Sequence, residues 1–278
     1  AFAYVTDITD NKNRSAGLGK VSAGLGLGFM TGPAIGGLLA GNDVANANYI
    51  LVALSGAGIN LIAMLATIFF LKESLPVEDR RPFGSVLNLF EKGTFSPEKT
   101  ILPLIICGLI FYTAMSLMEA IFPLWSNSIF DYGPTNIGTV FFMLGFIGVV
   151  VQGGLIGPMT KIAGEIRLVQ IAAFFVALGL MLIGLSKETS ILWMGLFFYG
   201  LGAAIFNPCL SSLVSKCAKP YERGKFLGQY QSASAMGRII GPTFSGVLYT
   251  NFIASAPLYV GALVILPIIV VIANFTLR

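Results

Sequence analysis

Residues 14–39 read RSAGLGKVSAGLGLGFMTGPAIGGLL, a glycine-rich stretch that indicates the architecture of the whole chain. Gly24, Gly28, Gly32 and Gly36 recur every fourth residue, so on an α-helix they form one stripe along one face. Small residues at this spacing allow two helix backbones to approach closely in lipid. We therefore expect a membrane-spanning helix that packs through its glycine stripe.

The same pattern returns in residues 223–248, which read RGKFLGQYQSASAMGRIIGPTFSGVL. At one common offset an arginine, a proline and several glycines keep their register, and the stripe becomes Ala233, Gly237, Gly241 and Ser245. This agreement predicts two homologous halves related by a parallel repeat, a plan that recurs in secondary transporters. The matched pairs are Arg14 and Arg223, Gly19 and Gly228, Gly28 and Gly237, Gly32 and Gly241, Pro33 and Pro242, and Gly37 and Gly246.

Composition identifies an integral membrane protein. Of 278 residues, 55% are hydrophobic and only 11% are charged, whereas a soluble domain has about 25% charged residues; the mean hydropathy is +0.83. The chain has no histidine, which excludes a histidine proton relay, and its three cysteines have no paired spacing. We expect no metal, no cofactor and no enzymatic activity, because no nucleotide-binding, zinc-protease or Ser/His motif is present.

Apolar segments of about 20 residues predict an all-α multi-pass protein with eight complete spans. A polar, proline-containing connection divides the chain into residues 1–72, the remainder of an N-terminal six-helix half, a cytoplasmic linker at 73–99, and a C-terminal six-helix half at 100–278. Residues 1–8 are interpreted as the tail of an earlier span, which implies an N-terminally truncated sequence. The eight spans are 18–40, 49–71, 101–125, 136–158, 168–186, 190–215, 224–249 and 256–276.

Lysine and arginine lie on alternate connections, and of the opposite connections only the one at 187–189 has a basic residue, Lys187. The positive-inside rule places the basic connections, and with them the C-terminus, in the cytoplasm.

GFMTGPAIGG at residues 28–37 resembles the antiporter motif G-x(3)-G-P-x(2)-G-G of the major facilitator superfamily. The chain is similar to the twelve-span, tetracycline-efflux-like drug:proton antiporters of that superfamily. The motif residues are Gly28, Gly32, Pro33, Gly36 and Gly37, and its repeat supplies Gly237, Gly241, Pro242 and Gly246.

Two further segments resemble the cytoplasmic loop motif of the same family. GPMTKIAGEIR at 157–167 is similar to its C-terminal copy but has Ile162 and Ile166 where a basic residue is usual, and YVTDITDNKNR at 4–14 looks like the turn before the antiporter helix. The resemblance implies the major facilitator fold and proton-coupled efflux of small amphipathic or drug-like compounds. The residues that match the loop motif are Asp7, Arg14, Gly157, Lys161, Gly164, Glu165 and Arg167.

Glu119 is the strongest candidate for proton or cation coupling, because it lies well inside the apolar segment LIFYTAMSLMEAIFPLW. A charge there costs roughly 2.5–3.5 kcal/mol, so such a residue normally faces a cavity or a partner. Arg238 is the basic residue that lies deep within a span, at a similar depth. We expect a Glu119–Arg238 pair, either exchangeable during transport or permanent and structural.

Other polar and aromatic residues are weaker candidates for a substrate cavity, because polar groups in membrane helices often serve only as contacts between helices. These are Tyr112, Ser116, Phe122, Gln152, Tyr199, Asn207, Gln231 and Ser234.

The sequence thus predicts a monomer in the cell membrane, with an organelle membrane as the alternative. Its partners would be a small-molecule substrate, protons and the lipid bilayer, but no nucleic acid. Two other functions stay open: an importer or facilitator of a sugar, organic acid or other metabolite, and a fragment that does not transport. The upstream coding sequence would separate a complete transporter from a fragment.

Overall fold

The computed structural model describes residues 14–71, 101–218 and 223–275, without the side chains of residues 14–23 and Leu25. The described elements are all helical, which confirms the predicted all-α class. The predicted tail at 1–8 and the linker at 73–99 lie outside the described residues. The elements are α2 (Arg14–Ala40), α3 (Tyr49–Phe70), α4 (Leu102–Phe130), α5 (Pro134–Val150), the π-helical turn η3 (Val151–Leu155), α6 (Ile156–Leu185), α7 (Thr189–Cys217), α8 (Arg223–Asn251), α9 (Ala256–Ile265) and α10 (Pro267–Ala273).

Among the described residues, five helical segments are long and apolar enough to cross a membrane. One of them, Pro134–Leu185, has 52 residues, far more than the roughly 20 that a bilayer needs. It covers two predicted spans, and the break between them falls at Gly164, whose φ of 74° and ψ of 154° are not helical. α2 contributes the shorter apolar segment Gly26–Ala40, and α8, with two arginines, a lysine and two glutamines, is less apolar.

Gly164 offers a direct test of this break. Its backbone lies in a region that is essentially restricted to glycine and costs other residues about 1–3 kcal/mol. Gly164→Ala is therefore expected to lower the melting temperature in detergent. Gly157→Ala is the matched control, because Gly157 is helical and an added Cβ meets nothing within 4 Å. Equal melting temperatures for the two variants would contradict the break at Gly164.

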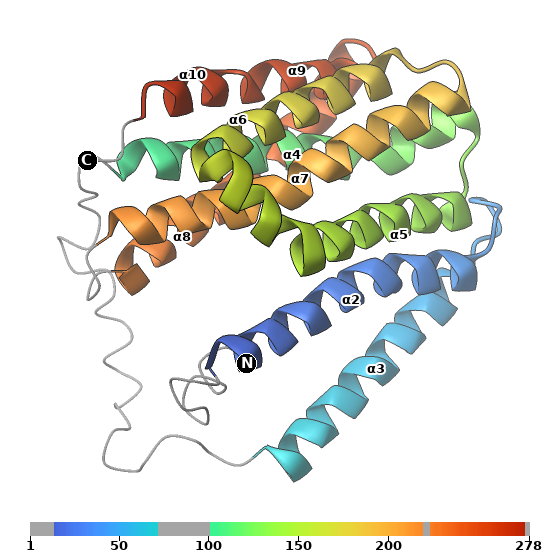
Figure 1. Cartoon of the computed structure of the whole chain (residues 1–278). Coiled ribbons are helices and arrows are strands. Elements are labelled where there is room, and N and C mark those ends of the chain that lie inside the picture. Colours follow the sequence, from blue (N-terminus) through green and yellow to red (C-terminus); the bar gives the residue numbers. More distant parts are fainter. Residues whose placement is uncertain (1–13, 72–100, 219–222, 276–278) are drawn as a thin grey trace.

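The C-terminal helices form the main core. α4 packs along α8, α6 packs along α7, and α9 and α10 cover α6 and α4. At the centre, Phe111 of α4 stacks on Phe206 of α7, with ring centroids 3.7 Å apart and planes within 2°. α2 lies beside α5, and α3 lies on the outer side of α2 with no buried residue of its own (Figure 1).

The stripe predicted from the repeat is a close helix contact on α8. A Cβ added to Gly237 would lie 2.7 Å from the Leu109 carbonyl oxygen, and one added to Gly241 would lie 2.9 Å from the Leu117 nitrogen. Ser245 donates a hydrogen bond to the Leu117 carbonyl at 2.9 Å. The packing role predicted for this stripe is therefore confirmed for α8 against α4.

On α2 the contact uses a different face from the one predicted. Within the described part of the chain, an added Cβ on Gly24, Gly28 or Gly32 meets nothing within 4 Å, and on Gly36 it meets only the Val52 side chain at 3.7 Å. Among the described helices, this stripe is therefore not the face through which α2 makes its close contacts, and its packing against the rest of the protein stays a prediction.

The close contacts of α2 lie on a neighbouring face of the helix, which contains Met30, Pro33 and Gly37. A Cβ on Gly37 would lie 2.5 Å from the Pro134 carbonyl oxygen, and a Cβ on Gly138 would lie 2.6 Å from the Pro33 carbonyl oxygen. Gly145 of α5 meets Met30 of α2 in the same way. The glycines of α5 thus select which face of α2 becomes the interface, and the spacing within α2 alone does not contain that information.

Candidate functional site

A cavity of about 680 Å³ lies between α2, α3, α4 and α5. Its walls are mostly apolar and aromatic, and of the described residues that line it, only Glu119 is charged. Asn127 adds an amide. An apolar pocket with few polar groups is the usual form of a small-molecule site. Its apolar and aromatic lining includes Phe29, Pro33, Val52, Leu124, Tyr132, Pro134, Ile137 and Phe141.

The cavity follows from the local sequences of its walls. On α4, Glu119, Pro123 and Asn127 are spaced by four residues and so share one face. On α2, Pro33, Gly36 and Gly37 project little side-chain volume, which leaves room beside the close contact with α5. The hydroxyl of Thr135 donates a hydrogen bond to the Gly37 carbonyl at 3.0 Å and fixes α2 and α5 together at this wall.

The predicted Glu119–Arg238 pair is not formed in this structure. Among the described residues, the ion pair within 4.0 Å is a different one, between Lys216 and Glu165. The guanidinium of Arg238 lies instead over the ring of Tyr112, 4.5 Å from the ring centroid. Glu119 and Arg238 are both exposed, and they still attract each other electrostatically.

Several weaker candidates lie in the protein interior. Ser116 donates to the Tyr112 carbonyl of its own helix at 2.6 Å and also reaches the Gly237 carbonyl of α8 at 3.1 Å. Ser234 donates to the Tyr230 carbonyl of its own helix at 2.8 Å. Phe122 is fully buried beside Trp125. These contacts favour packing roles for these three residues.

The remaining candidates are dispersed. Tyr112 and Tyr199 are buried, and Asn207 accepts a hydrogen bond from the Tyr230 hydroxyl at 2.8 Å. Gln152, in η3, and Gln231, on α8, are exposed. The cavity lining includes none of them. The sequence indicated Glu119 but missed its surroundings, although Asn127 could have been found as a polar residue two turns further along the same face.

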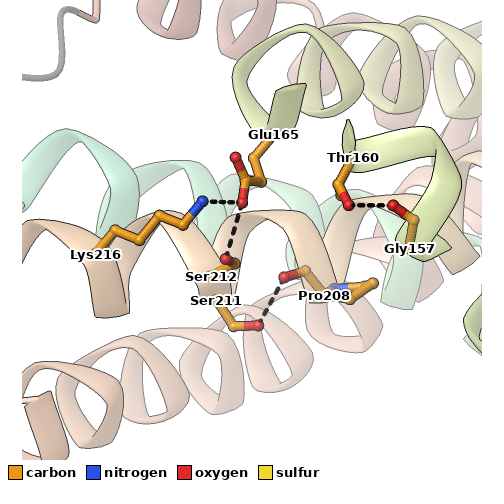
Figure 2. A network of polar contacts seen from close by, with 7 residues as sticks. All are labelled: Gly157, Thr160, Glu165, Pro208, Ser211, Ser212 and Lys216. Atoms are coloured by element: carbon orange, nitrogen blue, oxygen red, sulfur yellow. Dashed lines mark hydrogen bonds and ion pairs between the residues drawn. The ribbon is translucent and has the colours of Figure 1, made fainter. Parts of the chain in front are cut away.

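The loop motif forms a separate polar contact between α6 and α7 (Figure 2). Glu165 forms an ion pair with Lys216 and accepts a hydrogen bond from Ser212 at 3.2 Å. Lys216 is the basic residue in the last turn of α7, a position that could have indicated it in the sequence.

The other members of the motif do not join this contact. Thr160 donates to the Gly157 carbonyl at 2.9 Å, and Lys161 and Arg167 are exposed. Asp7 lies outside the described residues, and Arg14 is described only as the first residue of α2.

Asp43, in the turn between α2 and α3, also lies outside the cavity lining. A hydrogen bond from the Asn46 side chain and one from the Ala45 backbone hold the pKa of the Asp43 carboxyl below its usual value. Through these hydrogen bonds Asp43 stabilises the turn in which it lies.

Long apolar helices meet around a cavity with one carboxylate among its described lining residues, an arrangement typical of polytopic membrane proteins. The chain belongs to the Major Facilitator Superfamily, whose model matches residues 1–242 and 155–278.

Relatives support the same assignment. The chain is 30% identical to Multidrug resistance protein 2 of Bacillus subtilis (strain 168) over 253 residues, which is 89% of this chain and 61% of that protein. It is 27% identical to the human Major facilitator superfamily domain-containing protein 10 over 267 residues, which is 89% of this chain and 57% of that protein. The chain therefore spans less than two thirds of the length of these relatives.

A solved structure has the same fold. The crystal structure of the human organic anion transporter MFSD10 (TETRAN) superposes with a TM-score of 0.68 at 23% sequence identity, covering 98% of this chain and 66% of that one. This likeness confirms the predicted major facilitator fold.

Proposed function

We propose that this chain is part of a secondary active transporter that exports small amphipathic compounds in exchange for protons. Membership in the Major Facilitator Superfamily and the 30% identity to a protein named for multidrug resistance support this function. The transporter would be a monomer in the cell membrane, with its C-terminus in the cytoplasm.

The observation that carries the proposal is the position of Glu119 in the apolar wall of the cavity. A carboxylate in such a place can bind a cationic group of a substrate or a proton, but not both at once. Because the substrate and the proton compete for one carboxylate, movement of one across the membrane drives movement of the other in the opposite direction. Aromatic side chains such as Phe29, Tyr132 and Phe141 would supply the contact surface for the apolar part of the substrate.

The contact between α2 and α5 would act as one of the seals of the pathway. Gly37, Gly138 and Gly145 bring the two helices into backbone contact directly beside the cavity. In alternating access, one half rocks against the other around the binding site. Separation of α2 from α5 would open this side of the cavity.

The negative charge of Glu119 favours cations or neutral compounds over anions. Human MFSD10 is an organic anion transporter, so we expect the two proteins to differ in the charge of their substrates.

Flux measurements on the full-length protein test the proposal. Vesicles with an acidic interior, clamped at zero membrane potential, should accumulate tetraphenylphosphonium above its external concentration, because protons that leave drive the cation inward. Protein-free vesicles are the control, and collapse of the pH gradient should release the cation. Uptake that only reaches equilibrium, with or without the gradient, would indicate a facilitator and reject proton exchange.

A further inference from the structure

We propose that Tyr112 is a positioning residue that holds Arg238 away from Glu119 and so keeps the carboxylate available to a cationic ligand. The inference rests on the proposed role of Glu119 as the ligand-binding carboxylate. The inference explains why the nearby Arg238 does not neutralise the charge of Glu119.

The guanidinium of Arg238 can interact favourably with either of two residues of α4, Tyr112 or Glu119. Tyr112 and Glu119 are seven residues apart, so they lie on the same face of the helix, separated by about 10 Å along its axis. The guanidinium is found at the first position, 4.5 Å from the Tyr112 ring centroid, and no ion pair joins it to Glu119. The negative face of an aromatic ring attracts a cation without using a carboxylate.

The ring of Tyr112 is held firmly enough to serve as this platform. Its side chain is only 8% exposed and packs edge-on against Phe111, with ring centroids 5.4 Å apart. Its hydroxyl interacts with Tyr230, which in turn donates a hydrogen bond to Asn207. α4, α7 and α8 together therefore fix the ring.

The backbone geometry brings Arg238 to the ring. The neighbouring Gly237 lies so close to α4 that an added Cβ would be 3.1 Å from the Tyr112 Cβ. This contact places the start of the Arg238 side chain beside Tyr112. Arginine is long and flexible, so without the ring its charge would be free to extend toward Glu119, which already attracts it.

If the ring is removed, Arg238 should pair with Glu119 and compete with any cationic ligand. An ion pair in a membrane cavity is poorly screened, so the competition should be strong. A neutral ligand of the same shape would be almost unaffected. The charge dependence of binding therefore separates positioning of Arg238 from a general loss of structure.

The experiment measures the binding of tetraphenylphosphonium and of neutral triphenylphosphine oxide to the full-length protein in detergent. Tyr112→Leu fills the space with an apolar side chain but has no ring, and should weaken tetraphenylphosphonium binding by about tenfold. Binding of triphenylphosphine oxide should stay within about twofold, since its contacts are uncharged. Tyr112→Phe retains the ring but lacks the hydroxyl contact with Tyr230, so its tetraphenylphosphonium binding should lie much closer to that of the wild type than to that of Tyr112→Leu.

The double variant Tyr112→Leu/Arg238→Gln should recover tetraphenylphosphonium binding, because no arginine is left to occupy Glu119. The proposal is overturned if Tyr112→Leu binds tetraphenylphosphonium normally, if it weakens both compounds equally, or if the double variant does not recover. The Glu119→Gln variant distinguishes failure of the inference about Tyr112 from failure of the proposed function. Unchanged tetraphenylphosphonium binding by Glu119→Gln would reject the carboxylate site and this inference together, whereas weaker binding would leave the site standing.

Discussion

Gly241→Leu is expected to abolish stable folding of the protein in detergent. Gly241 is buried on α8, and an added Cβ would already lie 2.9 Å from both the Leu117 nitrogen and the Ser116 Cβ of α4. The Leu117 nitrogen belongs to a regular helix and cannot move alone, so the two helices would have to separate. Overpacking of this kind costs about 1–3 kcal/mol for small additions and more when backbone must shift.

Thermal unfolding and size-exclusion chromatography measure this effect. Gly246→Leu is the matched control, because Gly246 is an exposed glycine on the same helix and an added Cβ meets nothing within 4 Å among the described residues. We expect Gly241→Leu to aggregate or to melt far below the wild type, while Gly246→Leu elutes as the wild type does. Similar behaviour of both variants would show that α8 does not pack on α4 through this stripe.

The positions of the helices could be predicted closely because apolar length is a local property of the sequence. The predicted span at 49–71 is observed as Tyr49–Phe70, and the one at 190–215 lies within Thr189–Cys217. Local departures from a regular α-helix could not be predicted from the length of the apolar segments. The π-helical turn at Val151–Leu155 falls inside a predicted span, and the span predicted at 256–276 is divided at Leu266, before Pro267.

The packed face of α2 shows a second limit of the sequence. Both Gly32 and Gly37 belong to the antiporter-type motif, yet only Gly37 meets a described backbone. The choice depends on Gly138 and Gly145 of α5, which are a hundred residues away in the sequence. On α8 the predicted stripe was correct because α4 offers a complementary surface at Leu109 and Leu117.

The candidate site was only partly predictable for the same reason. Glu119 could be identified from the sequence because placing a charge inside an apolar span costs free energy. Its pairing with Arg238 was inferred from their similar depth, but depth does not determine the direction in which a side chain extends around the helix axis. Tyr112 was predicted only as a weaker cavity residue, and the contact of its ring with the guanidinium of Arg238 is visible only in three dimensions.

Glu119→Gln is expected to remove proton-driven transport while leaving the fold intact. The amide has nearly the same shape as the carboxylate, and Glu119 is exposed to the cavity without an ion-pair partner among the described residues, so little packing changes. Unlike the carboxylate, the amide neither carries a negative charge nor exchanges a proton near neutral pH. Flux of tetraphenylphosphonium driven by a pH gradient should fall by about tenfold or more, which corresponds to an activation free energy of transport higher by at least about 1.4 kcal/mol.

Asp131→Asn provides the control for simply losing an acidic residue. Asp131 ends α4 with φ of 55°, a left-handed conformation that asparagine adopts readily, and it is not part of the cavity lining. This variant should transport like the wild type. If Glu119→Gln instead retains the full effect of the pH gradient, the carboxylate at the cavity wall is not the coupling group. The proton would then have to bind elsewhere in the full-length protein, because Glu119 is the one acidic residue among the described residues that line the cavity.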